Sequence, residues 1–450
     1  MRKRIWSSLI VISFIIISCN NKVDNEYISM VEHPAWANDA VIYEVNTRQY
    51  TDEGTFKAFS NHLPRLKELG VEILWFMPIH KIGVIDRKGT LGSYYSVMDY
   101  KSINPEFGTL DDFRNLVEEA HGLGMKVIID WVANHTSRDG VWLKNNSEWY
   151  VIDSITKKPV APFDWTDVAK LDFSNDSLRF AMIDAMKYWL EEANIDGFRC
   201  DVAGEVPVDF WIMAVQELKK IQPELFMLAE AELPVLQENA FNMYYGWRFH
   251  HIMNGIATGK FNTDSIRNYY SKEVTKFPKN TIPMNFTSNH DENSWNGTEF
   301  ERLKEHTEQM AVLSFLLPGM PLIYNGQEVG FNKRLQFFEK DIIDWNGNYY
   351  FTDLYKKLIQ LRKSVPAIYA FNFDGFSEIK TNDSKNVFAF LRESEESKLV
   401  GLFNFSSIEV KIKLQKYKDE DGYINFKSGT LAQIPETIII EPFGYKIFYK

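Results

Sequence analysis

Apolar segments of strand length alternate with amphipathic helical segments along most of the chain. Near-continuous apolar runs predict eight buried strands, at residues 41–50, 71–79, 126–132, 197–203, 224–230, within 240–249, 284–291 and 320–329. Helically spaced apolar positions predict helices at residues 55–69, 110–123, 178–193, 208–221, 266–275, 302–316 and 352–363. Continuous apolar strands separated by helices indicate a parallel sheet that helices cover. Eight such units favour an α/β fold of the closed (β/α)8 TIM-barrel type over an open sheet.

Two parts of the chain depart from this alternation. Residues 135–176, after the third strand, are too long for a plain loop and are rich in aromatic residues, which indicates a small inserted subdomain. From residue 368 to residue 450 the helical pattern stops, and short alternating segments predict strands at 387–392, 399–404, 409–414 and 437–440. We therefore expect a barrel at 41–134 and 177–367, and a C-terminal antiparallel β-sandwich domain at 368–450.

The first 18 residues have the pattern of a bacterial lipoprotein signal peptide. Arg2, Lys3 and Arg4 precede an apolar run at residues 5–17 that is shorter than a membrane span. The run ends in Ile16-Ile17-Ser18-Cys19, which resembles a lipobox. We expect residues 1–18 to be removed, Cys19 to carry lipid, and residues 19–40 to tether the folded part to the cell envelope, in the periplasm, at the outer membrane or at the cell surface. An ordinary signal peptide with an incidental cysteine is the other interpretation.

Composition narrows the class of protein. Hydrophobic residues make up 45% of the 450 residues and charged residues 25%, as in ordinary globular proteins. The formal net charge is −11, and no cluster of lysine and arginine outside the N-terminus suits a phosphate backbone, so nucleic acid is not an expected partner. With only two cysteines, Cys19 and Cys200, lipidation of the first would leave no disulfide possible.

Acidic and polar side chains stand where several predicted barrel strands end. They are Asp130 with Asn134-His135, Arg199-Cys200-Asp201, Glu230, and Asn289-His290-Asp291. TIM-barrel enzymes carry their catalytic groups at the C-terminal ends of the strands. Any one of these ends also suits a structural role, such as an ion pair, a helix cap or a solvated carboxylate. Four ends together favour a single active site.

The predicted strand at 197–203 suggests the chemistry. Residues two apart on a strand share a face, so Arg199 and Asp201 project together while Phe198 and Cys200 point the other way. We expect the Arg199 guanidinium to lower the pKa of Asp201 and keep it ionised, as a nucleophile requires. Glu230 follows an apolar run, and desolvation there is expected to raise its pKa and suit it to general-acid work.

These carboxylates fit glycoside hydrolysis. A retaining glycosidase uses one carboxylate as nucleophile and a second as acid/base, about 5–5.5 Å apart. Neighbouring fourth and fifth strands of a barrel can supply that separation.

The short motifs at these strand ends resemble those of a known family. They are Asp130-Trp-Val-Ala-Asn-His135, Gly197-Phe-Arg-Cys-Asp201, Phe226-Met-Leu-Ala-Glu230, Phe286-Thr-Ser-Asn-His-Asp291, Val168-Ala-Lys-Leu-Asp172, and Gly92-Ser-Tyr-Tyr-Ser-Val-Met-Asp99. In this order along the chain they resemble the α-amylase family, glycoside hydrolase family 13.

The resemblance implies a role for each matched position. Asp201 would be the nucleophile, Glu230 rather than Glu232 the acid/base, and Asp291 the stabiliser of the transition state. Substrate-binding positions would be Arg199, His135, His290, Tyr95 and Asp130. The implied activity is double-displacement cleavage, with retention, of α-1,4 bonds in starch-derived glucans and maltooligosaccharides. Asn134 and Asp172 match positions that often help to bind calcium in the family, so Ca²⁺ is a candidate cofactor.

Two departures bear on specificity. Gly204 and Glu205 stand after the nucleophile where many α-amylases carry Lys-His, and Lys170 stands where many have Asp. Lys170 resembles the neopullulanase and cyclomaltodextrinase relatives, so an enzyme of that type is an alternative. A transglycosylating enzyme of the trehalose-forming type and a non-catalytic glucan-binding relative are further alternatives.

Overall fold

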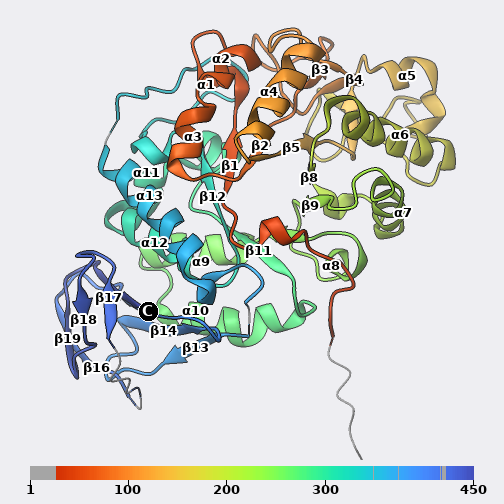
Figure 1. Cartoon of the computed structure of the whole chain (residues 1–450). Coiled ribbons are helices and arrows are strands. Elements are labelled where there is room, and N and C mark those ends of the chain that lie inside the picture. The colour runs from red at the N-terminus through yellow and green to blue at the C-terminus, as the bar shows by residue number, and fades with distance from the viewer. Residues whose placement is uncertain (1–26, 348, 373, 416, 418–421) are drawn as a thin grey trace, which may run out of the picture.

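A computed structural model describes residues 27–347, 349–372, 374–415, 417 and 422–450. Its centre is a closed barrel of eight parallel strands in the order β1-β12-β11-β10-β9-β8-β5-β2, which confirms the predicted TIM barrel (Figure 1). The barrel strands are β1 (Ile42–Val45), β2 (Ile73–Phe76), β5 (Lys126–Trp131), β8 (Gly197–Cys200), β9 (Phe226–Ala229), β10 (Met243–Tyr245), β11 (Ile282–Asn285) and β12 (Met320–Tyr324).

Helices surround the barrel strands (Figure 1). The α-helices of the described residues are α1 (Thr47–Tyr50), α2 (Phe56–Ser60), α3 (Leu63–Leu69), α4 (Leu110–Gly122), α5 (Val141–Asn145), which belongs to the insertion after β5, α6 (Asp176–Ala193), α7 (Val208–Leu218), α8 (Leu236–Asn239), α9 (Trp247–Ala257), α10 (Thr263–Asn268), α11 (Glu299–Leu303), α12 (Thr307–Leu316) and α13 (Tyr349–Ser364).

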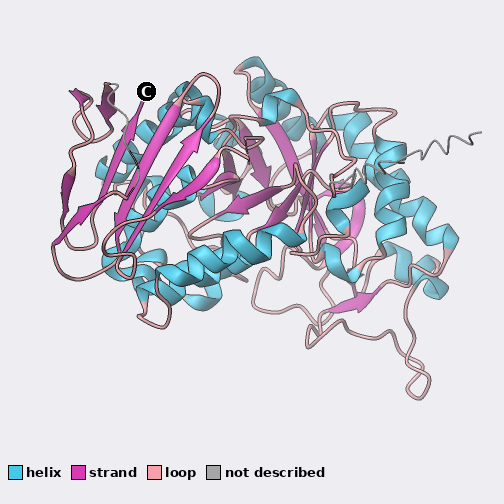
Figure 2. Ribbon diagram, turned by 90° about the horizontal axis from the view of Figure 1, so that it is seen from below, coloured by secondary structure: helices cyan, strands magenta, loops and turns pink. Residues whose placement is uncertain are grey.

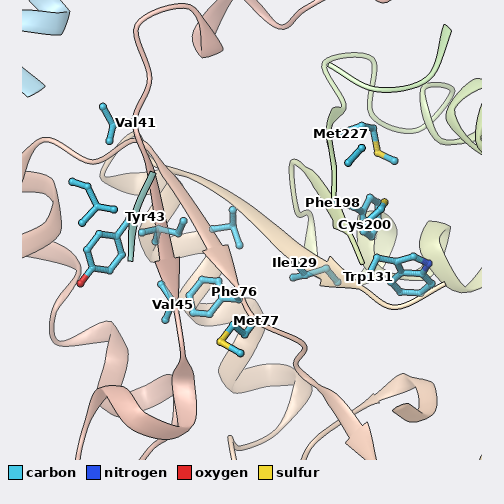
Figure 3. Close-up of a cluster of buried hydrophobic side chains, with 14 of the residues drawn as sticks. Val41, Tyr43, Val45, Phe76, Met77, Ile129, Trp131, Phe198, Cys200 and Met227 are labelled. Carbon is cyan, nitrogen blue, oxygen red and sulfur yellow. The ribbon is translucent and has the colours of Figure 1, made fainter. Parts of the chain in front are cut away.

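Alternation of side chains along each strand builds two apolar layers. Val41, Tyr43 and Val45, along and beside β1, pack into the layer between barrel and helices (Figure 3), whereas Ile42 packs with Trp75 inside the barrel. On β8, Phe198 and Cys200 face the outer layer, and Arg199 faces inward with Asp201, as the two-residue spacing predicts.

Gly197 lets β8 approach β9 closely. A Cβ atom at this position would lie 1.9 Å from the backbone oxygen of Phe226, which no rotamer change can relieve. We expect Gly197→Ala to push the strands apart and to cost about 1–3 kcal/mol or more, as overpacking does. The check is the thermal unfolding midpoint beside Gly122→Ala, because a Cβ at Gly122, in α4, meets no atom within 4 Å. Equal midpoints in the two variants would contradict the expectation.

Several predicted elements end or break where the sequence analysis expected continuity, among them the strand 284–291, which ends at Asn285. The predicted strand 41–50 is wrong beyond Val45, since α1 follows and buries Arg48 against Glu106. The predicted helix 55–69 divides into α2 and α3, because Pro64 lacks an N–H and begins a new helix in the first turn of α3. The predicted helix 302–316 breaks into α11 and α12 at Lys304, whose φ is 52°.

The insertion after β5 lies beside the C-terminal ends of the barrel strands. Residues 135–176 contain α5 and two short antiparallel strands, β6 (His135–Ser137) and β7 (Val168–Lys170). A second antiparallel pair, β3 (His80–Ile82) and β4 (Val97–Ile103), follows β2. Tyr100 on β4 donates to the backbone oxygens of Val132 and His135, which joins this pair to the base of the insertion.

The C-terminal region is the expected antiparallel β domain (Figure 2). One sheet has the order β13-β14-β15-β20-β17-β18, β16 pairs with β19, and one apolar cluster spans both sheets. The sequence analysis missed β13, β17, β18 and β20. The strands are β13 (Phe376–Ile379), β14 (Val387–Glu393), β15 (Lys398–Asn404), β16 (Val410–Lys413), β17 (Tyr423–Asn425), β18 (Leu431–Ala432), β19 (Thr437–Ile440) and β20 (Tyr445–Tyr449).

The described part of the N-terminal segment packs on the barrel. The predicted tether at residues 19–40 is wrong for residues 27–40, because Ser29 N bonds Lys279 O, Met30 N bonds Glu238 O, and Ala37 is fully buried. The signal peptide and Cys19 lie outside the described residues. In the part of the chain that the structure describes, none of the helices combines the length and apolarity needed to cross a membrane.

Candidate active site

The acidic residues of the motifs meet at the C-terminal end of the barrel. Asp201 follows β8, Glu230 follows β9, and Asp291 lies beyond β11. All three line one pocket of about 370 Å³, together with Tyr95, His135 and His290. The structure therefore gathers six of the eight residues that the sequence assigned to catalysis and substrate binding around one hollow.

The other two, Asp130 and Arg199, lie behind this lining and are fully buried. Arg199 Nη1 donates to Asp130 Oδ1 at 2.9 Å and to Asp201 Oδ1 at 3.1 Å, while its Nη2 lies 2.9 Å from Glu230 Oε2. Its Nε donates to the hydroxyl of Tyr245 at 3.1 Å. One guanidinium thus fixes the nucleophile and acid/base candidates relative to each other, which a planar donor fork does better than a point charge.

A left-handed corner follows Asp201. The predicted strand 197–203 is too long, because β8 ends at Cys200 and Val202 adopts φ 36° and ψ 47°. A β-branched residue at positive φ is a genuine outlier, of the kind that concentrates at functional sites. The corner directs Val202 N toward Glu230 Oε2, to which it donates at 2.7 Å. Backbone strain thus supplies a second anchor for the candidate acid/base.

Burial controls the charges of the carboxyl groups. Desolvation raises the pKa of Asp201, although Arg199 opposes it, and the charges of Asp130 and Asp291 add to the rise. The prediction that Arg199 holds this pKa below its ordinary value is wrong in net direction, since burial outweighs the ion pair. Desolvation also raises the pKa of Glu230, which confirms the expectation for that residue. Together the two carboxyls can hold one proton near neutral pH, as an acid and a nucleophile require.

The two pocket histidines differ in charge. Burial lowers the pKa of His135 to about 3, so it is neutral, and its ring lies against Trp165 of the insertion. Burial also opposes a charge on His290, but Asp291 and Glu44 outweigh it and raise the pKa of His290 to about 9. His290 also stacks on Tyr95, with ring centroids 5.4 Å apart.

The candidate calcium ligands supply few oxygens. Asn134 Nδ2 lies 3.3 Å from His135 Nδ1, and Asp172 Oδ1 accepts a bond from Ser174 N. Within the described ranges, no group of three or more His, Cys, Asp or Glu side chains gathers in a way that could hold a metal ion. Asn134 and Asp172 alone supply fewer than the six to eight oxygens that calcium takes. Calcium binding stays a prediction.

The match to a protein-family model identifies the family of this chain. The model for the catalytic domain of α-amylase matches residues 38–168 and 147–346, which is more than half of the chain and includes every barrel strand. The chain belongs to the α-amylase family. It is therefore a glycoside hydrolase, as the paired carboxyls at the strand ends predict.

Similar proteins within the α-amylase family carry several activities in their names. An α-amylase of Haloarcula japonica is 29% identical over 83% of this chain, which spans 56% of that relative. Neopullulanase 2 of Thermoactinomyces vulgaris is 26% identical over 81% of this chain and 68% of its own length. The crystal structure of a maltogenic α-amylase of Thermotoga neapolitana superposes with a TM-score of 0.83 at 28% identity, covering 92% of this chain and 98% of the other.

The sequence analysis assigned no functional role to the aromatic residues of the pocket wall or to the acid Glu44. Trp165 of the insertion lines the pocket together with Trp295, Phe337 and Phe338, and the ring centroids of Trp295 and Phe337 are 5.2 Å apart. The aromatic content of residues 135–176 hinted at Trp165, but no local pattern marks the other three. Glu44 is a single acid inside an apolar strand, and the sequence analysis gave this unusual position no role.

The two specificity departures meet in this family member. Lys170 Nζ lies 3.4 Å from Glu205 Oε2, both half-exposed. Lys170 ends β7 opposite His135 in the β6–β7 register, and Glu205 closes the turn after Val202, so the pair stands beside the pocket rim. The sequence singled out both positions, and the structure joins them in one ion pair.

Proposed function

We propose that this enzyme cleaves α-1,4-glucosidic bonds in starch-derived glucans and maltooligosaccharides by double displacement with retention. The observation that carries the proposal is that Asp201, Glu230 and Asp291 line one pocket, with Arg199 bonded to the first and in contact with the second. The α-amylase and maltogenic names of similar proteins support the substrate class.

In this proposal Asp201 attacks the anomeric carbon and forms a glycosyl ester, while Glu230 gives its proton to the leaving glycosidic oxygen. Glu230 then takes a proton from water, which attacks the ester and releases the sugar in its original configuration. Asp201 Oδ2 suits the attack, because Oδ1 is bonded to Arg199 and Oδ2 has no hydrogen-bond partner among the described residues. Asp291, His135 and His290 would bind the ring hydroxyls as positive charge develops.

The alternative is a neopullulanase or cyclomaltodextrinase type of enzyme. Lys170 paired with Glu205 favours it, as does the name of the Thermoactinomyces relative. A lipid anchor on Cys19 and a place in the cell envelope also belong to the proposal, supported by the sequence of residues 1–19 alone.

Product analysis tests the proposal. The purified full chain is incubated with maltoheptaose, amylose, pullulan and a cyclodextrin, and the anomer first released is recorded by proton NMR. We expect short linear maltooligosaccharides from maltoheptaose and amylose, released as the α-anomer because two displacements retain configuration. Faster cleavage of pullulan or the cyclodextrin would favour the alternative. Release of the β-anomer, or no product from any of the four, would contradict a retaining glucan hydrolase.

A further inference from the structure

Glu44 is a fully buried acid inside the barrel. Alternation along β1 directs it inward with Ile42, while Val41, Tyr43 and Val45 pack on the other side (Figure 3). Burying a carboxylate is costly unless a donor or a positive charge compensates. Its side-chain partner is His290, whose Nδ1 lies 2.5 Å from Glu44 Oε1. The acid thus contacts the far side of a pocket histidine without lining the pocket.

A chain of hydrogen bonds on the Nε2 side of the His290 ring bears on whether Nε2 also carries a proton. His290 Nε2 lies 2.7 Å from the hydroxyl of Tyr95, which lies 3.0 Å from Asp130 Oδ2. A hydroxyl has one proton to give. If Tyr95 donates to the Asp130 carboxylate, then His290 Nε2 must carry a proton and donate to Tyr95. Because Nδ1 faces a carboxylate, it must carry a proton too, and the ring is then an imidazolium.

The charges around the ring agree with this assignment. Glu44 from β1 and Asp291 beside His290 are negative, with Asp291 Oδ2 3.4 Å from Nε2. Tyr95 from the segment before β4 and Asp130 from β5 also face it, while Arg199 from β8 is the opposing positive charge. Burial disfavours the charged ring, but the acids prevail and the pKa of His290 rises to about 9.

We propose that Glu44 is a positioning residue that holds His290 as an imidazolium, so that Nε2–H stays a donor toward Tyr95 and the bound sugar at neutral pH. Without Glu44 the ring would lose one proton and Nε2 would accept from Tyr95, which would then release Asp130. Glu44 would thereby orient, through His290 and Tyr95, the Asp130 carboxylate that shares Arg199 with Asp201. The charge state of His290 does not depend on the proposed function, and only the role of His290 toward a bound sugar rests on that function.

The titration of His290 tests the charge state directly. Nitrogen-15 NMR of histidine rings is recorded on the full chain against pH, for the wild type, Glu44→Gln and, as a matched control, Glu328→Gln. Glu328 is also a buried barrel acid, but it pairs with Tyr43 and Arg65. The resonance is assigned by its loss in His290→Asn. We expect both ring nitrogens protonated at pH 7 in the wild type and control, and a titration at least one unit lower in Glu44→Gln.

Stability gives a second measurement. A histidine with a raised pKa contributes stability that is present below its unfolded value of about 6.5 and is lost as pH rises through about 9. The unfolding midpoint of the wild type should therefore fall more steeply with pH over this window than the midpoint of Glu44→Gln. A neutral His290 at pH 7 in the wild type, or the same titration in Glu44→Gln, would overturn the proposal.

Activity separates this inference from the proposed function. In Glu44→Gln we expect kcat/KM on maltoheptaose at pH 7 to fall about 100-fold, as for misplaced catalytic groups, with kcat falling more than KM rises. Activity equal to the wild type would overturn the positioning role. If the wild type cleaves no glucan, the proposed function fails, while the His290 titration still decides the charge state.

Discussion

Asp201→Asn is expected to abolish glucan cleavage, with kcat/KM lower by on the order of 10⁴- to 10⁶-fold. An amide cannot form the glycosyl ester, whereas its oxygen can still accept the 3.1 Å bond from Arg199. The unfolding midpoint should stay close to that of the wild type, because a neutral amide replaces a carboxyl that burial already disfavours as an anion. The measurement is initial rates on maltoheptaose beside a thermal melt.

The matched control for Asp201→Asn is Glu232→Gln. Glu232 follows the same motif as Glu230, is part-buried, and accepts a bond from Arg248 N. Its substitution should change the rate only a few-fold. Retention of more than about 1% activity in Asp201→Asn, or an equal loss in the control, would contradict the assignment of the nucleophile.

Arg199→Met is expected to disable both fold and chemistry. Removing the guanidinium leaves the carboxyls of Asp130, Asp201 and Glu230 buried without their shared partner. Breaking such buried pairs costs about 3–5 kcal/mol of the free energy of unfolding. The variant should also lose activity, because neither the nucleophile nor the acid keeps its orientation.

The loss in Arg199→Met should depend on pH. Without Arg199 the folded-state pKa values of these acids rise further above their unfolded values of about 4, so the folded state holds more protons. Stability therefore falls as pH rises through that interval, and the deficit in unfolding midpoint should be larger at pH 8 than at pH 5. Arg199→Lys, which returns one point charge, should recover part of the stability but little activity. A variant that melts like the wild type at pH 8 would refute this account.

The barrel and the gathering of the three carboxyls in one pocket could be predicted because their signals are local. Apolar runs mark buried strands wherever they pack, Asp201 and Glu230 directly follow such runs, and Asp291 lies beyond the run of β11. The end of β1 could not be predicted, because the burial of Arg48 in α1 depends on Glu106, 58 residues away. Short strands such as β17 and β18 carry too few residues for a pattern to show.

Electrostatics could be predicted only in part. Sequence spacing placed Arg199 beside Asp201, but the sign of the net pKa change depends on how completely the barrel excludes water. The partner of Glu44 is 246 residues away, so no local pattern could reveal what that acid does. A motif shows which neighbouring residues can pair. The exclusion of solvent and the distant partners, which decide the pKa values, depend on the assembled fold.

In the proposed mechanism, Val202 would link the stereochemistry of the reaction to the backbone. Its left-handed corner, with the bond from Val202 N to Glu230, holds the candidate acid/base near Asp201 through a peptide group that cannot rotate like a side chain. In glycosidases a wider spacing admits a water molecule between the second carboxylate, which then acts as base, and the sugar, and gives the inverted product. The surrounding strands must supply the energy that holds a valine in this conformation. In the proposed mechanism, retention at the anomeric carbon would therefore depend on a backbone corner that the closed barrel holds in place.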